Sequence, residues 1–394
     1  MRRGCPLIVL SLLEVLCGVL PAPIHSQVSV RMRDLPPAEQ TSVERFGPNA
    51  SVRALSDGRV VLHDGDRRRI VLLNDQLSVV KVVVDSATIS AAGLGDALPS
   101  YRLLPFKADT TGFMDVASQK LLFIDPSGRV ARSVPPPNVG DLFLLAGRVW
   151  MGTPSMDRLG RILYRGNATR RNSPNTPSGW EDSVPLVRWD MALARIDTVG
   201  QLRFDLATRR VQSGAPVGTA PRMLLNPLPF ADAWTILSDG TIAILRSEDH
   251  RIDWITAGDG HRSTTSVANP NPLLTLAQKQ QHVDTLRAGN AVRIARGSGG
   301  MADADLEYAA ASEIPDRFPA FHPRDVMADA DGFIWVARPA DRTGRVYDLI
   351  NRDGRVAERV RIPVGQVVVG LGPGRTVYVM DDGAKGTLRR SRVR

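Results

Sequence analysis

The chain has 394 residues, of which 43% are hydrophobic, 23% charged and 5% aromatic, and its formal net charge is +9. This composition excludes a disordered or collagen-like chain, and the length suits one large repeat-built domain or two to three ordinary ones. With 34 glycines and 28 prolines, turns must be frequent, which argues against a helical bundle.

Residues 1–26 have the pattern of a secretory signal peptide. Arg2 and Arg3 precede an apolar run from Pro6 to Leu20, which ends in a small and polar segment. This run of about 15 residues is short for a membrane span, which needs about 20. An uncleaved membrane anchor remains the alternative. We expect an exported protein, periplasmic or extracellular, without a transmembrane segment after signal cleavage.

The expected mature chain is basic and has no cysteine. Cys5 and Cys17 both lie in the predicted signal, so no disulfide or thiol remains. A plain solvated surface is the simpler explanation of the charge. Among specific partners, anionic lipid headgroups or polysaccharide suit a basic exported chain better than nucleic acid. We expect an envelope protein or polysaccharide as the partner. We expect a monomer that does not bind nucleic acid.

A turn followed by a short apolar strand recurs along the chain. The turn Leu55–Gly58 is repeated letter for letter as Leu237–Gly240. Asp-Gly supplies the positive φ of a tight hairpin, and the apolar run after it is typical of a strand buried on both faces. Turn chemistry therefore explains Asp57, Asp239 and Asp331. Six such strands begin near Arg59, Gly112, Arg148, Thr241, Phe333 and Arg375.

A second unit follows most of these strands, and it consists of a strand, a tight turn and a more polar strand. In the first copy, Ile70–Leu73 turns at Asn74–Asp75 into Leu77–Val80. Two hairpins per repeat make a four-stranded antiparallel unit, which is how a propeller blade is built. The sequence predicts an all-β fold, a six-bladed β-propeller of four-stranded antiparallel blades, as a single domain over residues 27–394.

Blade spacing predicts two insertions. The steps between the apolar strands are 53, 36, 93, 92 and 42 residues, whereas one blade needs about 40 to 50. Residues 153–183, rich in Arg, Asn, Pro, Gly and Ser, are expected to form a long loop. Residues 271–318 are expected to be partly helical, with a helix of about 16 residues that stops at Gly289. Its near-helically spaced apolar residues are Leu273, Leu276, Val283 and Leu286.

We expect this apolar helix face to pack against the propeller, which we favour over a partner-binding groove. The last repeat supplies only three strands, and the N-terminal segment is expected to provide the fourth. Either Val28–Arg33 or Ser42–Phe46 would complete that blade and remove an open sheet edge.

The motifs Asp331–Val336, Asp239–Ile244 and Asp353–Val356 resemble those of six-bladed propellers of the NHL-repeat and gluconolactonase-like group. The resemblance covers most of the mature chain and rests on structural motifs. Members of that group include lactonases with a central calcium or other divalent ion, peptidyl-glycine lyases and many binding proteins. The resemblance therefore implies a fold, and it allows calcium at the propeller axis, but it does not decide the function.

The sequence contains no zinc, nucleophile-elbow or dinucleotide-binding motif. In a propeller, ligands usually lie at one end of the axis, where loops that enter the innermost strands contact them, and Pro105–Asp109 is expected to be such a loop. A ring of Asp109, Asp232, His322 and Asp325 at such a channel mouth could hold a cation or a polar ligand. We favour the alternative, in which these residues cap strands and satisfy loop amides. Trp180, in the first insertion, either stacks on a ligand or anchors its loop.

Two functions are compatible with these patterns. We favour an exported, non-catalytic propeller that acts as a binding or scaffold module for an envelope or extracellular partner. The absence of a catalytic motif, the basic surface and the two insertions fit this hypothesis. The alternative is a metal-dependent hydrolase or lactonase with its site at the propeller axis. No catalytic or metal-ligating residue is assigned by the sequence.

Overall fold

The structure is a computed structural model. It describes residues 30–47, 50–85, 102–116, 118–146, 152–157, 159–166, 183–203, 207–210, 222–228, 231–256, 258, 260–264, 273–289, 293–295, 301–303, 307–319, 321, 326–383 and 385–393. The predicted signal, residues 1–26, lies outside these residues. Among the described helices, none has both the length and the apolar character that a membrane crossing requires.

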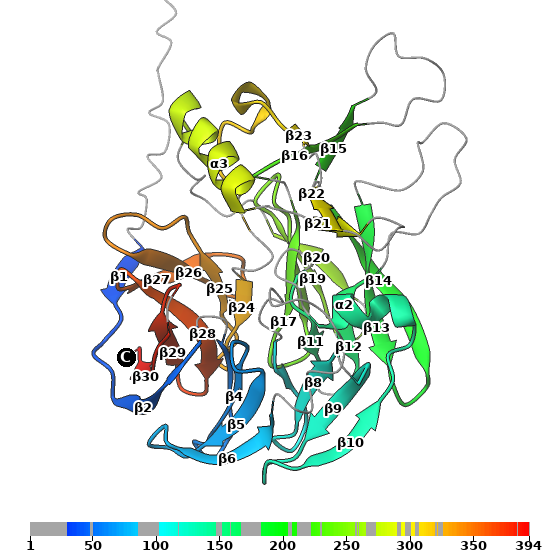
Figure 1. Cartoon of the computed structure of the whole chain (residues 1–394), viewed down its shortest axis with the longest axis vertical. Coiled ribbons are helices and arrows are strands. Elements are labelled where there is room, and N and C mark those ends of the chain that lie inside the picture. The colour runs from blue at the N-terminus through cyan, green and yellow to red at the C-terminus, as the bar shows by residue number, and fades with distance from the viewer. Residues whose placement is uncertain are drawn as a thin grey trace, which may run out of the picture.

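The predicted six-bladed β-propeller is confirmed, because six antiparallel sheets surround a common axis (Figure 1). Blade 1 contains β3 (Ala50–Ala54), β4 (Val60–Asp64), β5 (Arg69–Leu73) and β6 (Val79–Val84). Blade 2 contains β7 (Leu104–Pro105), β8 (Thr111–Asp115), β9 (Lys120–Ile124) and β10 (Val130–Val134). Blade 3 contains β11 (Ser155–Met156), β12 (Ile162–Arg165), β13 (Ser183–Asp190) and β14 (Arg195–Arg203).

The other three blades complete the ring. Blade 4 contains β17 (Ala233–Ile236), β18 (Ile242–Leu245), β19 (Ile252–Ile255) and β20 (His261–Ser263). Blade 5 contains β24 (Val326–Ala328), β25 (Ile334–Ala337), β26 (Arg345–Ile350) and β27 (Val356–Ile362), with β1 (Arg31–Asp34) added outside β27. Blade 6 contains β28 (Gln366–Gly372), β29 (Thr376–Asp381), β30 (Gly386–Arg392) and β2 (Gln40–Phe46).

Each blade begins at the axis and runs outward, so the ring has two distinct faces. The turn after each innermost strand lies on one face, here called the turn face. The loop leading into each innermost strand lies on the opposite face, here called the loop face, together with the turn between the second and third strands. This follows from the antiparallel order of every blade.

The turns have the chemistry that their sequences predict. Asp57 and Asp239 each accept a hydrogen bond from the backbone N–H two residues on, at 3.0 and 2.9 Å. Gly240 has φ +90°, a conformation that side chains with a Cβ rarely adopt. Asp331 bonds across blades instead, accepting from the Arg375 N–H at 3.0 Å. Aspartates of the turns therefore also join neighbouring blades.

The N-terminal segment closes the ring, as predicted. β2 is antiparallel to β30 and is the outermost strand of blade 6. Inside this pair, the Leu388 N–H donates to the Ser42 Oγ at 2.8 Å. β1 has a different role from the one considered for residues 28–33, because it pairs in parallel with β27 of blade 5. The two N-terminal strands thus bind two adjacent blades.

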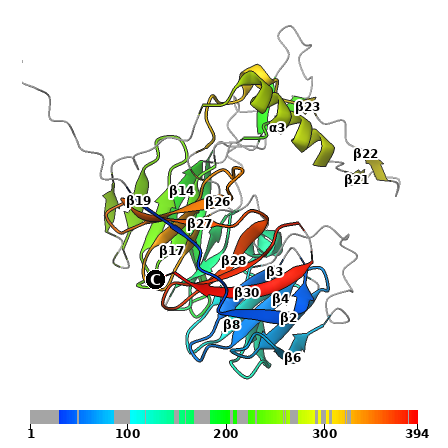
Figure 2. The ribbon, with the colours of Figure 1, turned by 90° about the vertical axis from the view of Figure 1, so that its left-hand side faces the viewer.

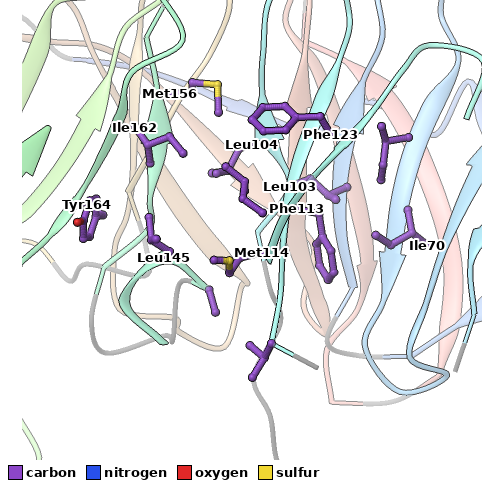
Figure 3. Packing of buried hydrophobic residues seen from close by; sticks show 14 of the residues in the cluster. Ile70, Leu103, Leu104, Phe113, Met114, Phe123, Leu145, Met156, Ile162 and Tyr164 are labelled. Atoms are coloured by element: carbon purple, nitrogen blue, oxygen red, sulfur yellow. The ribbon is translucent and has the colours of Figure 1, made fainter. Parts of the chain in front are cut away.

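The buried core of the described residues consists of five clusters, each shared by neighbouring blades, and Figure 3 shows residues of the largest one. Phe113 and Met114 of β8 lie among residues from blade 1 and blade 3, including Ile70 and Ile162. The helix α2 (Leu142–Leu145), preceded by the 3₁₀ helix η2 (Val139–Asp141), adds Leu145 to this cluster. The second strand of each blade is nearly continuously buried, as the apolar repeats predict.

Blade 3 differs from the sequence prediction. Its first two strands, β11 and β12, lie inside residues 153–183, which were expected to be a long loop. The turn between them has the same chemistry as the others: Asp157 accepts from the Leu159 and Arg161 N–H groups at 3.0 and 2.9 Å. Because polar residues surround this turn, the repeated pattern of a turn followed by an apolar strand was not recognisable here in the sequence. The strand expected near Arg148, and residues 167–182, lie outside the described residues.

An accessory unit stands to one side of the ring (Figures 1 and 2). It is built from two separate segments of the chain. The first contributes β15 (Ala207–Arg210) and β16 (Arg222–Leu225). The second contributes α3 (Leu276–Gly289), β21 (Arg293–Ala295), β22 (Met301–Asp303), β23 (Glu307–Tyr308) and the 3₁₀ helix η4 (Ala311–Glu313). β16 and β23 pair in parallel and join the two segments.

The predicted helix is confirmed as α3, with 14 residues ending at Gly289. Thr275 and Gln278 form a reciprocal cap: the Gln278 N–H donates to Thr275 Oγ1 at 3.3 Å and the Thr275 N–H to Gln278 Oε1 at 2.8 Å. The predicted packing of the whole apolar face is wrong. Val283 is buried, but Leu276 is 65% exposed.

Candidate functional site

A central cavity of about 490 Å³ follows the propeller axis. All six innermost strands or their flanking residues line it. Most of the lining is apolar, with Met156, Trp234 and Leu371 among the larger side chains. Three cationic residues, Arg53, Arg102 and Lys107, contribute to the lining near blades 1 and 2. Sequence analysis did not identify these cations, because they belong to no motif.

Arg53 is held rigidly at the turn-face end of β3. Its Nη1 donates to Thr111 Oγ1 at 2.7 Å and to the Asp109 carbonyl oxygen at 2.9 Å. Its Nη2 donates to the Phe106 carbonyl oxygen at 3.2 Å. Burial lowers the pKa of Arg53 to about 10, with the charge of Asp109 acting in the opposite direction. Arg53 therefore stays protonated at neutral pH and joins blade 1 to blade 2.

Lys107 and Phe106 follow β7 at the same end of the cavity. The Lys107 Nζ lies 5.7 Å from the centre of the Phe106 ring. The Phe106 ring also packs edge-on against Phe123, with ring centres 5.3 Å apart. The lining at blade 2 therefore combines an aromatic surface with an exposed ammonium group.

The predicted channel-mouth residues do not form one ring. Asp109 lies in the turn after β7, on the turn face, where its carboxylate accepts from the Ser56 N–H at 3.0 Å. Asp232 lies just before β17, on the loop face, at the other end of the axis. His322 and Asp325, like Trp180 of the first insertion, lie outside the described residues.

Asp232 serves the structure of blades 3 and 4. Its side chain is 3% exposed and accepts from the backbone N–H groups of Arg203 and Ser247, at 2.9 and 3.0 Å. Arg246 completes the set of partners through an ion pair in which its Nη1 lies 2.8 Å from the Asp232 Oδ2. This carboxylate caps a strand and satisfies loop amides, which is the interpretation that the sequence analysis favoured.

A second buried aspartate, which sequence analysis did not select, lies between β24 and β25. Asp329 is 4% exposed and accepts from the Trp335 Nε1 at 2.8 Å and from the Phe333 N–H at 2.8 Å. Burial raises the pKa of this carboxyl group, and the hydrogen bond from Trp335 opposes the rise. The bond fixes the large Trp335 ring in the core, so Asp329 is a structural residue as well.

Among the described residues, the predicted carboxylate ligands of a calcium ion at the axis are not brought together. Calcium takes about 6 to 8 oxygen ligands, whereas Asp109 and Asp232 lie at opposite ends of the axis and are bonded to protein donors. Over the described part of the chain, no group of three or more His, Cys, Asp or Glu residues is placed to hold a metal ion.

A second hollow, of about 680 Å³, lies between the accessory unit and blade 5. We call it the α3 groove. It is lined by α3 and by outer parts of blade 5, at residues Met32, Leu274, Gln278, Gln281, His282, Thr285, Phe318, Arg338, Pro339, Ala340, Asp341, Val346 and Arg359. The polar groove residues of α3 form no sequence motif, and only the spacing of its apolar residues was predictive.

No protein-family model and no curated protein matches this chain. Among solved structures, it is similar to a gluconolactonase from Xanthomonas campestris, with a TM-score of 0.43 and 10% identity over 91% of this chain and 99% of that one. It is similar to virginiamycin B lyase from Staphylococcus aureus, with a TM-score of 0.40 and 10% identity over 89% and 99% of the two chains.

The chain is also similar to regucalcin from Agrobacterium tumefaciens, a calcium-binding protein, with a TM-score of 0.41 and 10% identity over 92% of this chain and 97% of that one. These similarities concern the six-bladed propeller fold. At about 10% identity they specify neither an activity nor a ligand.

Proposed function

We propose that this protein is an exported, non-catalytic β-propeller that binds an envelope or extracellular partner, either a polysaccharide or a protein. The observation that carries the proposal is the accessory unit, which two separate segments of the chain assemble beside the ring and which leaves the α3 groove against blade 5. Hollows of about 300–1,000 Å³ with mixed polar and apolar walls are typical of ligand sites.

The basic composition and the predicted signal support the same proposal. A net charge of +9 favours accumulation of the whole molecule near anionic envelope components, independently of the ligand that the α3 groove accepts. The rigid ring, closed by strands from both ends of the chain, gives the accessory unit a fixed base. Function would then depend on the surface that the accessory unit and blade 5 present together rather than on chemistry at the propeller axis.

The test is a binding measurement on the chain from residue 27 onward. It would be immobilised, and purified envelope polysaccharides and purified envelope proteins would be passed over it. We expect saturable binding to at least one of these components. If none binds, and if small lactones are hydrolysed with a metal requirement that a chelator abolishes, the proposal is wrong.

The alternative, a metal-dependent hydrolase or lactonase, is favoured by one observation, the central cavity lined from all six blades. Two of its predicted site residues, His322 and Asp325, lie outside the described residues. Thermal unfolding with calcium, zinc or manganese, each against a chelator, tests it. A metal bound only by the folded state at a hundred times its Kd stabilises that state by about 2.7 kcal/mol.

A further inference from the structure

The two walls of the α3 groove come from different parts of the fold. One wall is the face of α3 that carries Gln281, His282 and Thr285. The other is the outer part of blade 5. In the strand register, Met32 of β1 lies beside Arg359 of β27, so their side chains share one face of the sheet.

Charges on the blade-5 wall balance one another. Arg359 Nε lies 2.7 Å from Asp348 Oδ1, and Arg338 Nη1 lies 3.8 Å from Asp348 Oδ2, so two guanidinium groups share one carboxylate. Asp341, at the edge of the groove, adds a second carboxylate, which accepts from the Thr343 N–H at 2.7 Å. Arg361, two residues beyond Arg359 on the same face of the sheet, pairs with Asp34 at 3.5 Å and adds one charge of each sign. Three cations and three anions therefore leave the described part of this wall without net charge.

The α3 wall is polar but uncharged. Gln281 and Thr285 are exposed and lie one helical turn apart on the groove side of α3. The Thr285 Oγ1 donates to the Gln281 carbonyl oxygen at 2.8 Å, so this hydroxyl offers a ligand an acceptor, whereas the Gln281 amide offers both a donor and an acceptor. His282 is half-buried, and burial lowers the pKa of its imidazole. Its ring packs edge-on against Phe318, with ring centres 5.1 Å apart. An aromatic surface therefore adjoins the amide and the hydroxyl.

We propose that the α3 groove binds a neutral saccharide segment of a polysaccharide chain. Sugar hydroxyls both donate and accept hydrogen bonds, and they match amides, hydroxyls and paired guanidinium and carboxylate groups. The apolar face of a pyranose ring matches the Phe318 ring and Met32. Because the described residues of the two walls carry no net charge, a uronate or sulfate group meets no unpaired cation among them. The inference rests on the proposed binding function and assigns its ligand class.

The experiment uses the chain from residue 27 onward and calorimetric titration with hexasaccharides of glucose, mannose, galactose and N-acetylglucosamine. A galacturonate hexamer serves as the anionic probe. The test variant is Q281A/T285A, which removes the amide and the hydroxyl without touching the helix cap. The matched control is Q280A/D284A, because Gln280 and Asp284 are exposed on the same helix, bond to each other at 3.0 Å and do not line the groove.

We expect at least one neutral hexamer to bind, Q281A/T285A to weaken it tenfold or more, and Q280A/D284A to leave its Kd within twofold. Equal affinity in the wild type and Q281A/T285A would overturn the inference, as would binding of the galacturonate hexamer alone. If only a purified envelope protein binds, the saccharide inference fails and the proposed function stands. If no saccharide and no envelope protein binds, both fail.

Discussion

At the scale of single residues, buried carboxylates of this propeller are used for structure. Asp232 and Asp329 are each surrounded by protein donors and have little contact with solvent. A buried carboxylate with its donors satisfied is costly to remove, because the donors are then left buried and unpaired. These residues should therefore respond to mutation through stability.

Replacing Asp232 tests this interpretation directly. Asp232→Ala removes the acceptor of two backbone N–H groups and one partner of Arg246. We expect the free energy of unfolding, measured in urea, to fall by about 2–4 kcal/mol. Asp75→Ala, in an exposed turn, is the control and should change it by less than about 0.5 kcal/mol. A variant as stable as the wild type would instead favour a role at a ligand site.

The ion pair between Asp239 and Arg352 joins blades 4 and 5 on the turn face. The hydrogen bond from Arg352 lowers the pKa of Asp239 from 3.8 to about 2. A lowered folded-state pKa means that the stabilisation is present above pH 3.8 and is lost as the pH falls through 2. Because both side chains are partly exposed, we expect Asp239→Asn to cost only about 0.5–1 kcal/mol at neutral pH.

A double-mutant cycle of Asp239→Asn and Arg352→Gln, followed by urea unfolding at several pH values, measures this pair. The coupling energy should be largest at neutral pH, should be mostly lost at pH 2 and should vanish below that pH. A coupling energy that does not change between these two conditions would show that the pair acts through packing, not through charge.

At the scale of elements, β2 completes blade 6, and the side chains on only one face of this strand are buried. Phe46 is 0% exposed, whereas Val43 of the same strand is 92% exposed. We expect Phe46→Ala to lower the free energy of unfolding by about 3–5 kcal/mol. Val43→Ala is the control, with a change of less than about 0.5 kcal/mol. Equal effects of the two substitutions, measured by urea unfolding, would mean that β2 does not pack as described.

The elements also show what the sequence could and could not predict. Repeated turns such as Leu237–Gly240 lie before strands buried on both faces, and this local pattern was sufficient for the fold. Blade 3 was obscured because β11 has only two residues and a polar segment follows it. The pairing of β16 with β23 joins residues about eighty positions apart, for which a single sequence contains no local signal.

The candidate site was less predictable than the fold, for a physical reason. Asp109 and Asp232 each lie near an innermost strand, but only the direction of that strand decides on which face of the ring a residue lies. The sequence analysis took the segment containing Asp109 as a loop leading into its blade, whereas it is the turn after β7. A two-residue strand such as β7 gives no periodicity from which its direction could be inferred.

At the scale of the whole molecule, the ring must close between blade 6 and blade 1. The innermost strands β28 and β3 pack closely there. A Cβ atom on Gly370 would lie 2.5 Å from the Val52 carbonyl oxygen, which is backbone and cannot move aside alone. Glycine is therefore required at this position by the approach of two strands from opposite ends of the chain.

We call the contact between β28 and β3 the seam. Gly370→Ala tests whether this seam limits the stability of the ring. Overpacking at a rigid contact typically costs about 1–3 kcal/mol, and we expect a loss of that size in urea unfolding. Gly258→Ala is the matched control, since a Cβ there meets nothing within 4 Å. Hydrogen exchange should locate the loss: β2 and β30, which close the ring through the same blade, should become less protected than β8 and β9 of blade 2. A uniform loss of protection over all blades would mean that the propeller opens as one unit and that the seam is no weaker than the rest.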